Sequence, residues 1–366
     1  MVKKIKSGEI WLDQDGKRIQ AHGGSIIQVE DRYFWYGENK ELTTADSDYW
    51  HNGMNCYSSV DLMNWTFEGK ILEPSEDPKS PLHHSKKCDR PHILYNAQNK
   101  EFVMWLKVMG DEALNGEEDS LEENNCQFMC VLKSSTITGK FEFLRKVYPC
   151  GMYSGDFDLY QDQRDGLAYI LFERPHTEII IADLTVDYYD ITGNYSAHFA
   201  HDGAPLAREA PCLFKKEDDF FLLTSGTAGY FPNPSEVATA KLIHGPWQVL
   251  GNPCSGDEFN DSFNCQFSSV FKVPGKQLYI ALGDRWMAGT SFDNASAGKF
   301  NTSEATYVWL PIIFEEGVPR IEWNESWSIV DYADDEPVDL MVQLREEMQG
   351  AATSFMRRQQ ASKVKN

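Results

Sequence analysis

Short runs of alternating hydrophobic and polar residues recur along the chain, and they are typical of β-strands. Five of these runs have the pattern of a hairpin, in which an apolar strand leads into a short polar turn and then a second strand rich in aromatic or aliphatic residues. The predicted hairpins cover residues 25–36, 92–105, 157–172, 211–223 and 268–282. The pattern therefore predicts an all-β fold.

Further strand-like sequence follows each hairpin, such as residues 54–59 and 64–67 after the first one. The whole unit recurs at roughly fifty to seventy residues, a period typical of propeller blades. Five copies predict a single five-bladed β-propeller over residues 1–335. A β-sandwich is the structural alternative, but its strands would be spaced more uniformly.

Two segments lie outside the repeat. Residues 110–125 are acidic and polar, and we expect a long loop between two strands of the second blade. Residues 336–366 contain a stretch, Val338–Met348, with helical spacing and helix-forming residues. This stretch predicts a short C-terminal helical extension that packs on the propeller or is partly disordered.

The net charge of −22 excludes a nucleic acid or an anionic membrane surface as partner, because either would need clustered Lys and Arg. A neutral oligosaccharide or polysaccharide fits better, and aromatic residues, 13% of the chain, either form sugar platforms or pack the sheets. The sequence has no run of apolar residues long enough to span a membrane and no apolar segment after its N-terminal lysines, so we expect a cytoplasmic protein, or a secreted one if a signal was removed.

The eight cysteines are scattered without the paired spacing of a zinc site, and the histidines show no ligand spacing. The sequence thus calls for no metal and no cofactor, although an ion on the propeller axis stays open. The oligomeric state also stays open.

In a propeller the first strand of each blade lines the central axis, so the starts of these strands meet at one mouth. Here the starts are polar or glycine-rich. This arrangement places several polar side chains around one small space, with a histidine and two glycines beside them: Asp89, Asp156, Glu209, Gln266, His22, Gly23 and Gly24.

Paired carboxylates in a pocket for a neutral sugar indicate glycoside hydrolysis, in which a protonated carboxyl donates to the leaving oxygen and a second group activates water. Glu209 has apolar neighbours that should raise its pKa, and Asp89 or Asp156 would raise it further by charge repulsion. Arg90 and Arg285 either keep neighbouring carboxylates ionised or form structural ion pairs.

Eight stretches, in this order along the chain, resemble glycoside hydrolase family 43, and most closely its exo-β-1,3-galactanase branch. The resemblance runs from about Trp11 to Tyr332. The stretches are IQAHGG (19–24), WYGENK (35–40), DRPHILYN (89–96), EAP (209–211), TSG (224–226), FNCQ (263–266), GDRW (283–286) and YVWLP (307–311). The resemblance implies a five-bladed propeller and an inverting enzyme.

Carried over by position, the resemblance implies that Glu209 is the general acid, that Asp89 orients the acid and tunes its pKa, and that Asp156 binds sugar hydroxyls. The wider family has an aspartate base in the first blade, which is missing in this branch and in this chain. In the branch a glutamine that matches Gln266 is thought to hold the attacking water. Because an amide is a poor base, Asp156 and Glu38 are alternatives for the group that activates the water.

The further substrate-binding candidates come from the same regions and are His22, Gly23, Gly24, Glu38, Thr227, Arg285 and Trp286. The resemblance implies an exo-acting hydrolase that releases galactose from β-1,3-linked galactan or galactooligosaccharides during arabinogalactan breakdown. An α-L-arabinofuranosidase or related glycosidase is one alternative, and a non-catalytic glycan-binding propeller is another. Two departures bear on the substrate: Asp89 stands where the branch has glutamate, and residues 110–125 fall where the branch presents sugar contacts.

Overall fold

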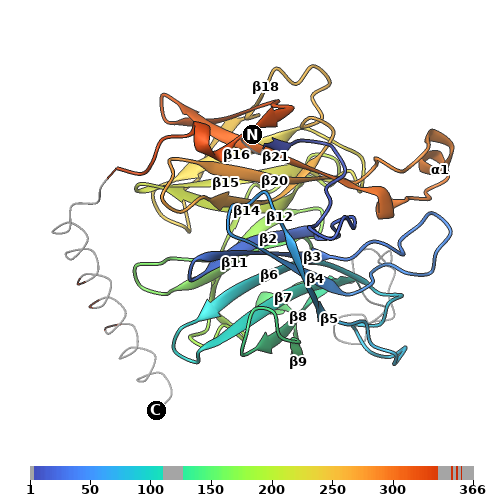
Figure 1. The fold of residues 1–366 in the computed structure, drawn as a ribbon. Helices are drawn as coiled ribbons and strands as arrows, with labels where there is room; N and C mark the ends of the chain where they lie inside the picture. Colours follow the sequence, from blue (N-terminus) through green and yellow to red (C-terminus); the bar gives the residue numbers. More distant parts are fainter. Residues whose placement is uncertain (1–3, 110–126, 337–347, 349–351, 353–355, 357–366) are drawn as a thin grey trace, which may run out of the picture.

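The computed structural model describes residues 4–109 and 127–336, together with the single positions 348, 352 and 356. In this part of the chain five antiparallel sheets follow one another along the sequence (Figure 1), and each sheet is built from consecutive strands in order. The first strands of the five sheets contact each other as a closed ring. The predicted all-β, five-bladed propeller is confirmed.

The strands of each blade run from the axis outward. The first blade is β2(His22–Val29), β3(Arg32–Glu38), β4(Met54–Ser59) and β5(Thr66–Leu72), and the second is β6(Lys87–Asn96), β7(Glu101–Met109), β8(Gln127–Ser134) and β9(Glu142–Val147). The third is β10(Phe157–Gln161), β11(Ala168–Arg174), β12(Glu178–Leu184) and β13(Ile191–His198), and the fourth is β14(Arg208–Lys216), β15(Asp219–Gly226), β16(Ser235–Ala240) and β17(Gln248–Gly251). The fifth is β19(Gln266–Lys272), β20(Tyr279–Arg285), β21(Thr306–Glu315) and β22(Val318–Glu322), with β18(Cys254–Ser255) added at its edge.

Both ends of the described chain meet at the fifth blade. The short strand β1(Ile5–Lys6) pairs with β23(Ser326–Trp327) and contacts β21 of that blade. The α-helix α1(Phe292–Ser296) lies in the connection between β20 and β21, and three 3-10 turns occur at η3(Pro149–Gly151), η4(Thr302–Glu304) and η5(Ile329–Asp331). Among the described helices, none is long and apolar enough to cross a membrane.

The hydrophobic core consists of five clusters, each of which lies between two adjacent blades. The cluster between the fifth and first blades is the most aromatic, and the rings of Trp35 and Trp309 there have centroids 4.8 Å apart. Such a pair adds about 0.5–1.5 kcal/mol to the burial of its rings. The blades are therefore held together by side chains, and the ring of inner strands is a rigid frame for the groups at its mouth.

Three inner strands begin with the same irregularity. The pairing register shifts just after His22, Asp89 and Glu209. The next residue in each strand has a left-handed backbone, with φ of 61° at Gly23, 52° at Arg90 and 49° at Ala210. A bulge of this kind turns the preceding residue out of the regular alternation, and strained residues of this kind cluster at functional sites.

The two segments outside the repeat are only partly described. Strand β7 ends at Met109 and β8 begins at Gln127, so the acidic segment 110–125 does connect two strands of the second blade. Its own conformation lies outside the described residues. The predicted C-terminal extension, residues 336–366, also lies outside them apart from position 336 and three single positions.

Candidate active site

A cavity of about 680 Å³ opens at the mouth of the propeller where the inner strands begin. All five blades contribute to its wall. Six of the predicted site residues line it, namely Glu38, Asp89, Asp156, Glu209, Gln266 and Trp286. Further lining residues that we did not predict as site residues carry charge or an aromatic ring, namely Lys40, Trp50, Lys87, Lys107, Glu173, His176, Tyr230 and Phe300. Arg90 also lines the cavity.

A chain of buried ion pairs crosses the cavity wall from the first blade to the third. Lys40 Nζ lies 2.6 Å from Glu38 Oε2 and 3.4 Å from Asp89 Oδ1. Lys107 Nζ then lies 3.2 Å from Asp89 Oδ2 and 2.7 Å from Asp156 Oδ1. Burial alone would raise the pKa of Asp89 and Asp156, but the adjacent cations outweigh it and hold both pKa values below the usual range. These two carboxylates therefore stay ionised.

Arg90 connects this chain to the opposite side of the cavity. Its Nε lies 2.8 Å from Asp156 Oδ2, its Nη2 donates to Gln266 Oε1 at 2.5 Å, and its backbone N–H donates to Glu38 Oε1 at 2.9 Å. One buried arginine thus fixes three groups from three blades. The sequence left two roles open for Arg90, to keep a neighbouring carboxylate ionised or to form a structural ion pair. The geometry supports the first role, because Arg90 pairs with Asp156 and lowers its pKa.

All hydrogen-bonding positions of the Gln266 side chain are occupied. Its Nε2 donates to Glu209 Oε1 at 2.9 Å and to Ser225 Oγ at 3.0 Å. Its Oε1 accepts from Arg90 and from Trp286 Nε1, the latter at 3.2 Å. The amide is therefore oriented by its surroundings, and it is bonded directly to Glu209.

The surroundings of Glu209 favour the neutral form of its carboxyl. Burial raises the pKa of Glu209 well above its ordinary value, and the negative charges of Asp156 and Glu173 raise it further, while Arg90 and Lys107 oppose this only in part. A carboxyl whose pKa is raised beside carboxylates whose pKa is lowered has the properties of a general acid.

Glu173 is a further carboxylate of the site that the sequence reasoning missed. It is the second-last residue of β11, is 3% exposed and lines the cavity, and its Oε1 accepts a hydrogen bond from the His176 N–H at 2.8 Å. Burial and the charge of Asp156 raise the pKa of Glu173 to about 7. The predicted site residues lie at the starts of the inner strands or within or directly after the stretches that resemble the family, and Glu173 on β11 lies in neither.

The remaining predicted substrate contacts do not line this cavity. His22 is fully buried, with its Nδ1 2.8 Å from Asp284 Oδ1 and its ring stacked on Tyr307. Thr227 is 3% exposed and lies outside the cavity lining. Arg285 donates to the backbone carbonyls of residues 263 and 264 and packs over a tryptophan ring, so it forms no ion pair with a site carboxylate. The roles of His22, Thr227 and Arg285 as substrate contacts stay predictions, and the positions of these residues do not favour such contacts.

Gly23 and Gly24 allow close packing against the second strand of the first blade, next to the site. A Cβ on Gly23 would lie 2.3 Å from Glu38 Oε1, and a Cβ on Gly24 would lie 1.9 Å from the carbonyl oxygen of Tyr36. The two glycines thus let the first hairpin and the Glu38 carboxylate approach closely. Their place in the structure is explained by packing rather than by contact with a sugar.

Replacing Gly24 with alanine is expected to lower the free energy of unfolding by about 1–3 kcal/mol, because the new methyl group meets backbone atoms that cannot move freely. Urea denaturation measures the change. Gly69→Ala in the same blade shows the cost of backbone strain alone, because φ is 122° at Gly69 and no atom lies within 4 Å of its Cβ position. No measurable loss for Gly24→Ala would show that the close approach is unimportant.

The buried carboxyls predict how stability depends on pH. Burial raises the pKa of Glu38 and of Glu173 from 4.5 to about 7 in the folded protein. Because the folded pKa lies above the unfolded one, the stability that these groups contribute is complete below about pH 4.5 and is lost as the pH rises toward about 7. Glu173→Gln should therefore show a smaller fall in Tm than the wild type between about pH 5 and 8. Parallel Tm curves for the two proteins would contradict this account.

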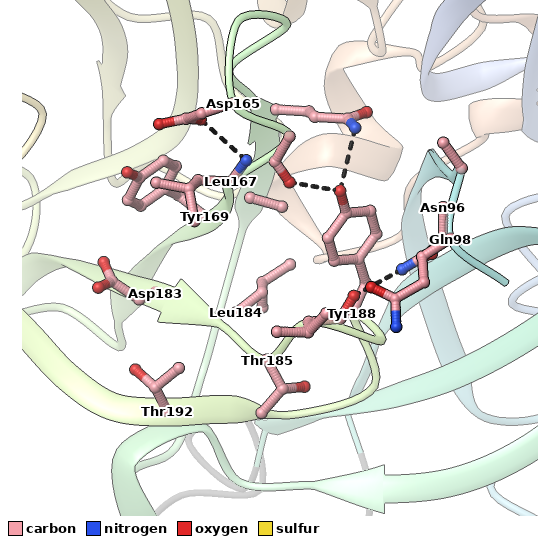
Figure 2. A pocket seen from close by; sticks show the side chains of 15 residues that line it. Asn96, Gln98, Asp165, Leu167, Tyr169, Asp183, Leu184, Thr185, Tyr188 and Thr192 are labelled. Carbon is pink, nitrogen blue, oxygen red and sulfur yellow. Dashed lines mark hydrogen bonds between the residues drawn. The ribbon is translucent and has the colours of Figure 1, made fainter. Parts of the chain in front are cut away.

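A second cavity, of about 420 Å³, lies between the second and third blades and is shown in Figure 2. Its polar groups are already bonded to one another: the Tyr188 hydroxyl donates to the Gly166 carbonyl at 2.6 Å, and Asp165 accepts from the Leu167 N–H at 3.0 Å. Asp183 pairs with His244 at 2.7 Å. This cavity shows no group poised for chemistry, so the mouth of the axis is the candidate active site.

Comparisons with known proteins give a consistent result. Residues 19–285 match the family of glycosyl hydrolases family 43. An exo-β-1,3-galactanase from Clostridium thermocellum is similar in structure, with a TM-score of 0.73, 30% identity, and coverage of 92% of this chain and 69% of that one. A β-1,3-galactosidase solved with galactodeoxynojirimycin has a TM-score of 0.73 and 29% identity, and the match covers 88% of this chain and 100% of that one.

One curated relative has a different specificity. A xylan 1,3-β-xylosidase from a Vibrio species is 25% identical over 235 residues, which are 62% of this chain. The chain spans only 40% of the length of that relative. The sugar on which this chain acts therefore has to be argued from its own cavity.

Proposed function

Because the chain belongs to glycosyl hydrolases family 43, we propose that it is an inverting, exo-acting hydrolase that releases galactose from β-1,3-linked galactan or galactooligosaccharides. It is a glycoside hydrolase, and enzymes of its family act on carbohydrates. The resemblance seen in the short sequence stretches is confirmed by the family match and by the galactanase structures. The choice of galactose and of the β-1,3 linkage is our proposal.

The observation that carries the proposal is Glu209, whose pKa is raised by burial and which is bonded to Gln266 in a cavity where the inner strand of the first blade begins without a carboxylate. The inner strand of the first blade begins His22-Gly23-Gly24, with the histidine buried. The galactanase branch, which eight short stretches of this chain resemble, shares this absence. The names of the two similar structures, a galactanase and a galactosidase, support this choice over an arabinofuranosidase.

We propose that Gln266 positions the acid, since its hydrogen-bonding capacity is already used. Its oxygen accepts two hydrogen bonds and its nitrogen donates two, one of them to Glu209. An oxygen that already accepts two hydrogen bonds is a poor proton acceptor for a water molecule. Activation of the water then falls to Glu38 or Asp156, the alternatives that the sequence left open.

Replacing Gln266 with alanine is expected to lower kcat about 10-fold or more with a smaller change in KM, because Glu209 loses the group that orients it. Steady-state kinetics on β-1,3-galactobiose measures both constants. Normal turnover in Gln266→Ala would remove this residue from the mechanism.

The proposed function is tested by product analysis on a panel of substrates. The purified chain is incubated in parallel with β-1,3-galactooligosaccharides, α-L-arabinofuranosides and β-xylooligosaccharides, and the released sugars are separated by chromatography. We expect galactose from the first substrate only. Release of arabinose or xylose instead would keep the catalytic site and overturn the specificity, and no release from any of them would favour a glycan-binding propeller.

A further inference from the structure

The third blade places a carboxylate in the cavity wall that the proposed mechanism does not use. Glu173 is buried, and its Oε1 is held by the His176 N–H. The backbone N–H of Asp156 also interacts with this carboxyl, but among the residues that the structure describes no side chain forms a hydrogen bond or an ion pair with it. A buried carboxylate oxygen beside a cavity is a strong acceptor for a donor that enters the cavity.

The other carboxylates of the wall are already engaged in the described structure. Glu38, Asp89 and Asp156 each form an ion pair with a buried lysine, and Glu209 is bonded to Gln266. Glu173 differs from them because, within the described residues, its carboxyl is bonded only by backbone N–H groups, those of His176 and Asp156, and by no side chain.

Gly155, which directly precedes Asp156, leaves room for the Glu173 carboxylate. A Cβ on Gly155 would lie 2.3 Å from Glu173 Oε2 and 3.4 Å from Gln127 Oε1. The backbone of Gly155 does not require glycine, since it lies outside the left-handed region of φ. The glycine is therefore explained by the space that the Glu173 carboxylate needs.

We propose that Glu173 is a substrate-contacting residue: its Oε2, given room by Gly155, accepts a hydrogen bond from a hydroxyl of the sugar in the cavity and so contributes to the choice of sugar. This inference rests on the proposed function, and it assigns a contact that the sequence motifs do not include. A sugar without that hydroxyl would leave a buried carboxylate unpaired, which makes such a contact a strong determinant of specificity.

The charges that face Glu173 come from three neighbouring strands. Asp156 directly precedes β10, the inner strand of its own blade, Lys107 belongs to β7, and Glu209 belongs to β14. Because Glu173 and Glu209 influence each other's protonation, a loss of turnover in a Glu173 variant would mix binding with acid strength. Binding is therefore measured in the Glu209→Gln background, where the acid no longer titrates.

Isothermal titration calorimetry with β-1,3-galactobiose and its monodeoxy analogues tests the contact. For the Glu209→Gln chain, removal of one hydroxyl should weaken binding about 10-fold or more, and the additional change Glu173→Ala should abolish that difference for the same hydroxyl. Glu173→Gln keeps the volume of the side chain in case the alanine variant is unstable. Gly155→Ala should also weaken binding, because it displaces the carboxylate.

Glu178→Gln is the matched control, since Glu178 belongs to the same blade and pairs with Arg174 outside the cavity lining. It should bind galactobiose as the parent chain does. The inference is overturned if the Glu173 variants distinguish every monodeoxy analogue as the parent does, or if they bind galactobiose equally well. Failure of the parent chain to bind galactobiose would instead overturn the proposed function on which the inference rests.

Discussion

Replacing Glu209 with glutamine is expected to lower kcat/KM for β-1,3-galactobiose by about 10³-fold, within the range that a general acid contributes. Glutamine has nearly the same shape as the protonated carboxyl and can keep the contact with Gln266, so the fold should be unchanged. It cannot give a proton to the leaving oxygen. Steady-state kinetics on purified proteins with matching near-UV circular dichroism measures the loss.

Two comparisons make this prediction specific to proton donation. An aryl galactoside with a strongly acidic leaving phenol needs little protonation, so Glu209→Gln should retain much more of its activity on that substrate. Glu236→Gln is the control variant, because Glu236 lies in the same blade near Arg208 but outside the cavity lining. Equal losses on both substrates, or a loss in the control variant, would argue against Glu209 as the acid.

Replacing Arg90 with methionine is expected to destabilise the protein by about 3–5 kcal/mol, the usual effect of removing one partner of a buried ion pair. Arg90 is 4% exposed and holds Asp156 and Gln266 through its guanidinium. Without it, Asp156 keeps only Lys107, and the Gln266 amide loses a hydrogen bond that fixes its orientation. Activity should fall together with stability.

Urea denaturation with a linear extrapolation measures the stability change. Arg285→Met is the comparison, since Arg285 is partly exposed and donates to backbone carbonyls outside the cavity. The loss of stability in Arg285→Met should be clearly smaller than the loss in Arg90→Met. A stable and fully active Arg90→Met variant would contradict the view that this arginine holds the site together.

The architecture and half of the site could be predicted from the sequence because both follow from strand order. Once the five hairpins are recognised, the first strand of each blade must face the axis, and the polar residues at its start must meet. Asp89, Asp156, Glu209 and Gln266 were found in this way, and the structure brings all four to one cavity. Their mutual hydrogen bonds depend on side-chain geometry, which strand order does not specify.

Two of the residues that the sequence reasoning missed, Lys107 and Glu173, lie opposite predicted ones in the hairpins. Asp89 pairs in register with Lys107, Glu209 with Ser225 and Gln266 with Asp284. Glu173 donates its backbone N–H to the carbonyl of Asp156 in the same way. A search of both strands of each hairpin at the same end would have found them.

The differences between the predicted and the observed site have a common physical cause. His22 looked like a polar group at a strand start, but Asp284 and Tyr307 satisfy its ring nitrogens inside the protein. A single sequence does not tell whether a buried polar side chain faces a cavity or an internal partner. The ion pair between Lys40 and Asp89 was missed for the related reason that a lysine in a strand connection usually faces solvent.

The central claim is that this propeller removes galactose from a β-1,3 linkage with inversion, by means of Glu209 as the acid. Time-resolved proton NMR of β-1,3-galactotriose during hydrolysis tests it most directly, because it identifies the sugar released and its first-formed anomer together. The account predicts that α-galactose appears first with the wild-type chain and that Glu209→Gln releases almost none. First-formed β-galactose, or equal release by the Glu209→Gln chain, would contradict it.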